Sequence, residues 1–160
     1  MNGQEPPLRN ADLPYRLRGL GMAGAVLHLG AHPDDEEAGL VAYLSRGLGV
    51  RTVYWSATRG EGGQNRTGPE RGEALGILRT WESLDARSLD GGELLYGPFY
   101  DFGFSRRGED ALSRWDRTAV VREMVRAIRR VQPHVVVSRW TGGPEDGHGH
   151  HQAVGLVVAE

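Results

Sequence analysis

The chain has 160 residues, a formal net charge of −2, 24 glycines and no cysteine. This length favours one domain with a sizeable hydrophobic core. The absence of cysteine excludes disulfides and thiolate zinc sites, so any metal site has to use histidine and carboxylate ligands. The mixed, nearly balanced charge gives no electrostatic reason to expect a nucleic acid or an anionic membrane as a partner.

Residues 1–24 are polar, contain proline and are weakly periodic, and we interpret them as an N-terminal extension. They contain no apolar run long enough for a signal peptide or a membrane span. The default expectation is therefore a cytoplasmic protein, with export of a longer precursor as an open alternative.

The first informative stretch joins an apolar run to a group of acids. Strand-forming residues from Ala25 lead to His32, and Pro33 is followed by four acidic residues and then by the helical pattern Ala38–Leu44. This order predicts a strand, a tight loop and a helix. In an open α/β sheet, side chains at the carboxyl end of a strand face the crevice in which ligands bind.

The imidazole of His32 and the carboxylates of Asp34 and Asp35 suit a divalent cation such as zinc. Because neighbouring aspartates cannot easily point the same way, one can bind a metal while the other faces a water molecule. The alternative is that the acids only cap the helix and complement its positive N-terminal dipole.

A second strand is predicted at Arg51–Ala57, since the run is rich in β-branched and aromatic residues. With the helix before it, this strand makes a βαβ unit of parallel strands. The glycine-rich segment 58–65 follows and lacks both common phosphate-binding fingerprints. It is either a flexible polar loop or a rim on which backbone amides and Glu61 meet substrate hydroxyls.

The remaining elements are taken from periodicity. Helices are predicted from Glu70 to about Leu84 and over 119–131, and a buried parallel strand over 134–140. The aromatic-rich segment 94–104 is expected to be a short strand followed by a loop over the opening of the pocket. Strands that alternate with helices predict an α/β fold.

A second cluster follows the last predicted strand. After a Gly-Gly-Pro loop come His148, His150 and His151, which open another helix. A single histidine on an apolar face is usually structural, whereas three within four residues at a strand's carboxyl end are more typical of a ligand.

With both clusters identified, the chain resembles the PIG-L (LmbE-like) family of zinc-dependent N-deacetylases. Members share an Ala-His-Pro-Asp-Asp-Glu motif after the first strand and a later His-x-x-His-x-Ala motif, found here at 31–36 and 148–153. A Thr-x-Gly-Glu stretch is also similar, at 58–61. The resemblance implies a Rossmann-like, three-layer α/β/α domain over 25–160 with a mostly parallel sheet, and it allows a truncation on the C-terminal side.

The resemblance also implies a ligand set and two catalytic groups. It implies that the zinc ligands are His32, Asp35 and His151, with Fe²⁺ as an alternative metal. It further implies that Asp34 is the general base, and that His148 is the cationic or hydrogen-bonding partner of the oxyanion.

Two further residues are assigned to substrate binding, Glu61 in the glycine-rich loop and Arg71 after it. Family members often have an arginine three residues before a glutamate in the helix that follows this loop. Arg71 stands only two residues before Glu73, so it departs from that spacing. His150 occupies a position where the family often has an acid, and it is given no role in the chemistry.

The sequence therefore predicts a zinc-dependent hydrolase that removes an N-acetyl group from a small N-acetylglucosamine-type conjugate. The alternative is a metal- or carbohydrate-binding domain of the same ancestry with little turnover, which the second carboxylate, Asp34, disfavours. A nucleotide-binding domain is disfavoured by the missing phosphate fingerprint. An open sheet edge makes a homo-oligomer a further hypothesis.

Overall fold

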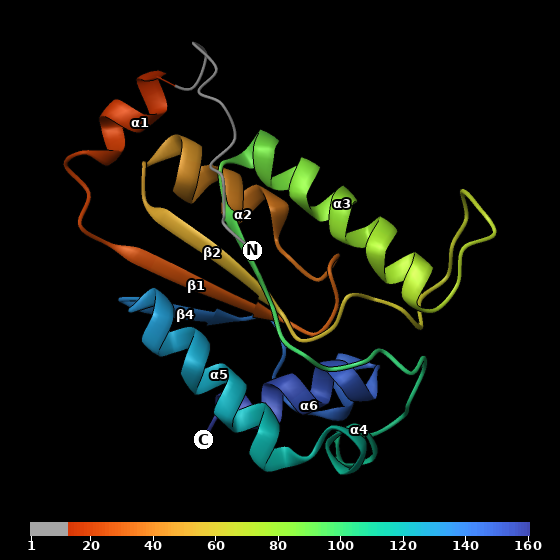
Figure 1. Ribbon diagram of the computed structural model, residues 1–160. Helices are drawn as coiled ribbons and strands as arrows, with labels where there is room; N and C mark the ends of the chain where they lie inside the picture. The colour runs from red at the N-terminus through yellow and green to blue at the C-terminus, as the bar shows by residue number, and fades with distance from the viewer. Residues whose placement is uncertain (1–12) are drawn as a thin grey trace.

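The computed structural model describes residues 13–160, and the first half of the predicted N-terminal extension lies outside them. Figure 1 shows a central sheet with helices on both faces. The sheet has four parallel strands in the order β3-β2-β1-β4, namely β1 (Ala25–Gly30), β2 (Arg51–Ser56), β3 (Glu93–Tyr96) and β4 (Val135–Ser138). The predicted three-layer, parallel α/β/α fold is confirmed.

Each helical layer comes from a separate part of the chain. One face carries α2 (Ala38–Ala42), which continues into the π-helical turn η2 (Tyr43–Gly47), and α3 (Glu73–Asp90). The other face carries α4 (Gly108–Trp115), α5 (Arg117–Val131) and α6 (Gly149–Val158) (Figure 1). Two short helices complete the list, α1 (Leu13–Gly19) and the 3₁₀ turn η3 (Pro144–Asp146).

The centre of the sheet is buried on both faces, as in parallel sheets covered by helices, but the face towards α2 and α3 carries polar residues such as His28, Thr52 and Tyr54. All six residues of β1 are buried, and so are five of the six in β2. The largest apolar cluster lies between these strands and the layer of α4, α5 and α6, where it includes Leu27, Trp55 and Trp115. Within residues 13–160, every helix is too short or too polar to cross a membrane.

The strand order places both sequence motifs at one point of the sheet. The chain leaves β1 for β2 on one side, whereas β4 pairs with β1 on the other side. The carboxyl ends of β1 and β4 therefore form a topological switch point, which is where open α/β sheets bind ligands. The loop after β1 carries residues 31–37, and the segment after β4 carries residues 139–148, so the two motifs meet there.

One strand and two helices differ most from the sequence predictions. The strand predicted as buried over 134–140 is shorter, and its Val135 and Val136 are exposed, because β4 lies at the edge of the sheet. Helix α3 begins later than predicted and runs six residues further, because Gly72 and Gly91 at its two ends adopt left-handed backbone angles (φ 59° and 81°) and set its limits. Helix α4 was missed, since it spans only eight residues beginning with glycine. It ends at Asp116, whose φ of 65° breaks the chain between α4 and α5.

Candidate metal centre

Three side chains from the two motifs converge beyond the carboxyl ends of β1 and β4. Nδ1 of His32 lies 3.4 Å from Asp35 Oδ2 and 3.2 Å from His151 Nε2, and His151 Nε2 lies 3.2 Å from Asp35 Oδ1. Ligand atoms about 2.0–2.2 Å from a tetrahedral zinc ion are about 3.3–3.6 Å from one another. Asp35 meets the two histidines with different carboxylate oxygens, and one ligand atom from each of the three residues lies within 4.8 Å of the others. The predicted set His32, Asp35 and His151 is thus brought together closely enough to hold one ion.

The loop after β1 is held from both sides. Backbone N–H groups of Ala31 and His32 donate to Asp35 Oδ2, each at 2.8 Å. From β2 and the residues after it, the Thr58 hydroxyl donates to the Ala31 carbonyl at 2.8 Å, and the Tyr54 hydroxyl donates to the His32 carbonyl. Because each of these buried groups has a partner, the loop holds its two candidate ligands in one arrangement.

The third candidate ligand, His151, is oriented by its other ring nitrogen. Nδ1 of His151 lies 3.0 Å from the Asp146 carbonyl oxygen, so it carries the proton and donates it, which leaves Nε2 free to face Asp35. The ring also stacks on Trp140 with centroids 3.8 Å apart and an interplanar angle of 3°. Trp140 follows β4 and was not assigned to the site from the sequence.

Contacts among the three side chains stabilise the ionised form of Asp35 and the protonated form of His151. Burial alone raises the pKa of Asp35, but hydrogen bonds and positive charge from His151 and His32 outweigh it and hold that pKa well below its usual range. Burial likewise lowers the pKa of His151, but the hydrogen bond and negative charge of Asp35 produce a net rise. Asp35 is therefore an anionic side chain at neutral pH.

His148 and His150 lie against the same centre. His148 caps the N-terminus of α6, where its Nδ1 accepts the backbone N–H of His150 at 3.1 Å, and its ring centroid is 5.0 Å from that of His32. Burial, and then the charges of His32 and His151, lower the pKa of His148 to about 4. A neutral His148 whose Nδ1 accepts has its proton on Nε2, which favours the hydrogen-bonding role over the cationic one.

Asp34, the predicted general base, has a different partner from Asp35. Its side chain is 73% exposed, and its carboxylate forms an ion pair with Arg79 of α3 at 2.6 Å. Both residues line a hollow of about 320 Å³ together with Gln64 and residues of the loop that follows it. Arg79 was not identified from the sequence. The signal was present, since Arg79 stands three residues before Glu82, which is the family's spacing that was sought at Glu73.

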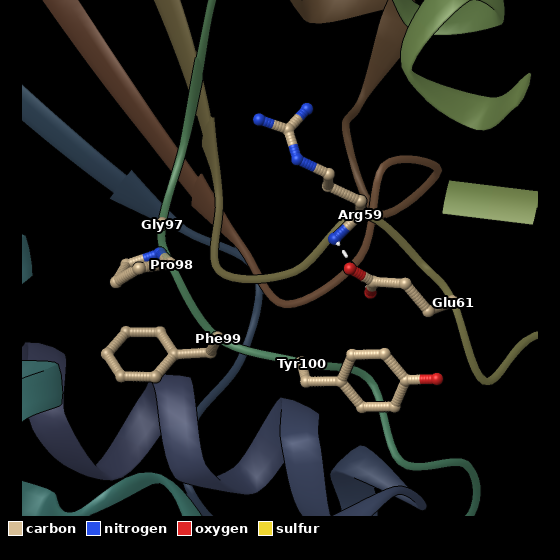
Figure 2. A pocket seen from close by; sticks show the side chains of 6 residues that line it. All are labelled: Arg59, Glu61, Gly97, Pro98, Phe99 and Tyr100. Carbon is tan, nitrogen blue, oxygen red and sulfur yellow. Dashed lines mark hydrogen bonds between the residues drawn. The ribbon is translucent and has the colours of Figure 1, made fainter. Parts of the chain in front are cut away.

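The two predicted substrate-binding residues are placed differently. Glu61 lines a hollow of about 170 Å³ with Arg59 and residues 97–100, as Figure 2 shows. Its Oε2 accepts backbone N–H groups of Arg59 and Asp101, both at 3.2 Å. Arg71 is exposed, and its guanidinium donates to the carbonyls of Gly68 and Glu70 in its own loop. The described contacts therefore join Glu61, and not Arg71, to a pocket.

The aromatic segment divides between core and surface. Phe99 and Phe102 pack against the core, and Phe102 also packs edge-on against His150 with centroids 4.3 Å apart. Phe104, in contrast, is 71% exposed and lies with its ring centroid 5.3 Å from that of His148. The segment after β3 thus brings an exposed aromatic ring beside the candidate metal centre.

The fold of the chain is that of known deacetylases and of one other enzyme. N,N′-diacetylchitobiose deacetylase from Pyrococcus horikoshii superimposes with a TM-score of 0.65 at 20% identity, over 97% of this chain and 59% of that one. GalB, the 4-carboxy-2-hydroxymuconate hydratase from Pseudomonas putida KT2440, gives a TM-score of 0.63 at 22% identity, over 85% and 54%. Since one of the two is a hydratase, the fold alone does not fix a reaction.

Sequence comparison is more specific. The chain is 32% identical over 143 residues to 1D-myo-inositol 2-acetamido-2-deoxy-alpha-D-glucopyranoside deacetylase from two strains of Mycobacterium leprae, Br4923 and TN. The alignment covers 78% of this chain and 45% of each relative, so the chain spans less than half their length. The family profile described as PIG-L: GlcNAc-PI de-N-acetylase matches residues 27–160. The converging His and Asp motifs at the switch point are thus those of a PIG-L domain, and the chain belongs to the PIG-L family.

Proposed function

We propose that this chain is a zinc-dependent deacetylase that hydrolyses the N-acetyl group of an N-acetylglucosamine-type conjugate. The observation that carries the proposal is the convergence of three side chains, His32, Asp35 and His151, whose closest nitrogen and oxygen atoms are 3.2–3.4 Å apart in each pair. These residues would hold the ion, with Fe²⁺ as the alternative metal. Zinc in such a site supplies a Lewis acid, which polarises an amide carbonyl and makes water easier to deprotonate.

The chain's own residues would move the protons. Asp34 accepts a proton as water attacks the amide carbon, and the leaving amine nitrogen must gain one as the carbon–nitrogen bond breaks. His148 presents its Nε2–H to the oxyanion that develops on the carbonyl oxygen, because its Nδ1 is occupied by the backbone N–H of His150. The products are acetate and the free amine.

The substrate class rests on the relatives and on the rim. The Mycobacterium leprae relative is a deacetylase of a 2-acetamido-2-deoxyglucopyranoside, and the solved Pyrococcus horikoshii relative is a deacetylase of diacetylchitobiose. In this chain both backbone contacts of Glu61 use Oε2, which leaves Oε1 for a sugar hydroxyl. We therefore place the acetamido sugar between the metal centre and the glycine-rich loop.

The test is amine release from a panel of N-acetylglucosamine conjugates, measured with and without a chelator. The proposal expects release from at least one conjugate that stops when the metal is removed. Release that does not depend on metal would contradict it. Sugar binding without release by the zinc-loaded chain would instead support a binding domain of PIG-L ancestry.

A substitution of Arg79 tests whether the ion pair with Asp34 matters for turnover. Because Arg79 holds the Asp34 carboxylate at 2.6 Å, we expect Arg79→Gln to lower kcat by about 10-fold or more while zinc content stays unchanged. Arg126→Gln is the matched control, since it also removes an ion pair with a carboxylate, Glu123 at 2.6 Å, but on the surface of α5. Equal rates for the two variants would show that the Arg79 contact has no part in turnover.

The oligomeric state is open to a direct measurement. Among residues 13–160, β4 pairs only with β1, and its Val135 and Val136 are exposed. An unpaired apolar edge strand favours pairing with a second chain. We expect size-exclusion chromatography with light scattering to give a concentration-dependent mass, and Val136→Lys to shift it to the monomer. A monomer at all concentrations would remove this hypothesis.

A further inference from the structure

His32 uses its two ring nitrogens for different purposes. Its Nδ1 faces Asp35 and His151, while its Nε2 points away from them to Nδ1 of His150, at 3.0 Å. When Nδ1 binds a metal it has no proton, so the proton of the ring is on Nε2 and is donated to His150. This direct contact makes His150, which has no role in the proposed chemistry, the partner of a metal ligand.

His150 is a polar side chain in an apolar environment. It is completely buried, with its ring centroid 4.5 Å from that of Trp115 and 4.3 Å from that of Phe102. If Nδ1 accepts from His32, the proton of a neutral His150 is on Nε2. Within residues 13–160, this Nε2 is a buried atom without a hydrogen-bond partner.

An unpaired buried donor destabilises a fold, because the group loses its hydrogen bonds to water and gains none. An aliphatic side chain of similar volume would fill the same space between Phe102 and Trp115 without that cost, so packing does not explain a histidine here. Positions that break a local rule in this way are typical of functional sites, where stability is given up for chemistry.

We propose that His150 is a positioning residue that orients the metal ligand His32 through an Nε2–H to Nδ1 hydrogen bond. Metal-ligating histidines usually donate their second nitrogen to a carboxylate, a carbonyl or water. The carboxylate nearest to this bond belongs to Asp101, whose Oδ2 lies 3.8 Å from His32 Nε2 and whose Oδ1 lies 3.6 Å from His150 Nδ1, both beyond hydrogen-bond length. The neutral imidazole of His150 thus takes the place that a carboxylate usually has. The proposed metal centre therefore has one negative charge fewer beside His32 than it would have with a carboxylate there.

The test is the zinc dissociation constant, measured by competition with a chromophoric chelator, together with the melting temperature of the metal-free protein. His150→Leu should weaken zinc binding by about 10–100-fold. It should leave the melting temperature unchanged or raise it, since the unpaired donor is gone. His150→Asn should recover most of the affinity, because its Oδ1 can replace Nδ1 as the acceptor. If His150 had only a structural role, His150→Leu would lower the melting temperature and leave the zinc affinity unchanged.

Several results would overturn the proposal. Unchanged zinc affinity in His150→Leu would do so, as would loss of the fold in that variant, which would show that the ring is needed for packing. Weakening in Asp101→Asn alone would assign the role to the carboxylate. His32, His148 and His150 also lie close enough to share an ion. Stoichiometric zinc in His151→Ala, combined with none in His150→Leu, would therefore make His150 a ligand.

This inference rests on the proposed metal centre, and the same measurement separates the two. A wild-type chain that binds no zinc would overturn the metal centre and with it the proposed function. A wild-type chain that binds zinc, with affinity unaffected in His150→Leu, would overturn only the role of His150.

Discussion

Asp34→Asn is expected to lower kcat for amine release by about 10²–10⁴-fold while zinc content stays at the wild-type level. The amide keeps the size and the hydrogen-bonding oxygen of the carboxylate but cannot accept a proton from water. Asp34 contacts Arg79 and is 73% exposed, in contrast to Asp35, whose oxygens face His32 and His151. The two neighbouring aspartates therefore have separable effects, one on turnover and one on metal. The measurements are kcat and zinc per chain.

Asp110→Asn is the matched control for this prediction. Asp110 is partly exposed and paired with an arginine, Arg107 at 3.2 Å, but it lies on α4 and outside both motifs. Its substitution should leave kcat and zinc content unchanged. Two results would contradict the role of Asp34: an Asp34→Asn variant that turns over at nearly the wild-type rate, or one that loses zinc together with activity, which would make Asp34 a ligand.

Removing the metal is expected to abolish amine release and to lower the melting temperature. The three converging side chains include an ionised, buried carboxylate, Asp35, whose charge a divalent cation would compensate. A ligand present at about 100 times its dissociation constant stabilises the folded state by about 2.7 kcal/mol. Thermal melts and kcat before and after dialysis against a chelator measure both effects, and added zinc should restore both.

The metal-removal experiment also addresses which ion is used. Reconstitution with Fe²⁺ under anaerobic conditions, compared with Zn²⁺ at equal occupancy, ranks the two ions by kcat, because the His₂Asp ligand set accepts either. Mg²⁺, a divalent cation without affinity for imidazole, is the control and should not restore activity. Full activity in a chain shown by elemental analysis to be free of metal would contradict a metal-dependent reaction.

The sequence predicted the parts of the site that follow strands. Residues 25–30 and 135–138 are apolar runs that form parallel strands, β1 buried and β4 partly exposed at the edge of the sheet, and the segment after each leads to a motif of metal-ligating residue types. Since parallel strands end at one edge of the sheet, their loops had to lie near each other. The meeting of His32, Asp35 and His151 thus followed from topology.

The parts that were not predicted depend on contacts between distant segments. Arg79 lies in the middle of α3, where helical periodicity gives only its face and not its reach to Asp34. Trp140 and His150 read in the sequence as an end of a strand and an extra histidine, and only packing shows that one stacks on His151 and the other bonds to His32. Periodicity identifies elements, whereas these contacts depend on how the elements are placed in three dimensions.

If the two motifs form one metal centre, the zinc content of the chain depends on residues of both motifs. Zinc per chain is measured by elemental analysis on the wild type, on His151→Ala, and on the control His134→Ala, whose ring accepts the Ala25 backbone N–H at the start of β1. We predict near-stoichiometric zinc in the wild type and in His134→Ala, and a sharp fall in His151→Ala. A wild-type chain that neither contains zinc nor takes it up, or a His151→Ala variant that retains it, would contradict the account.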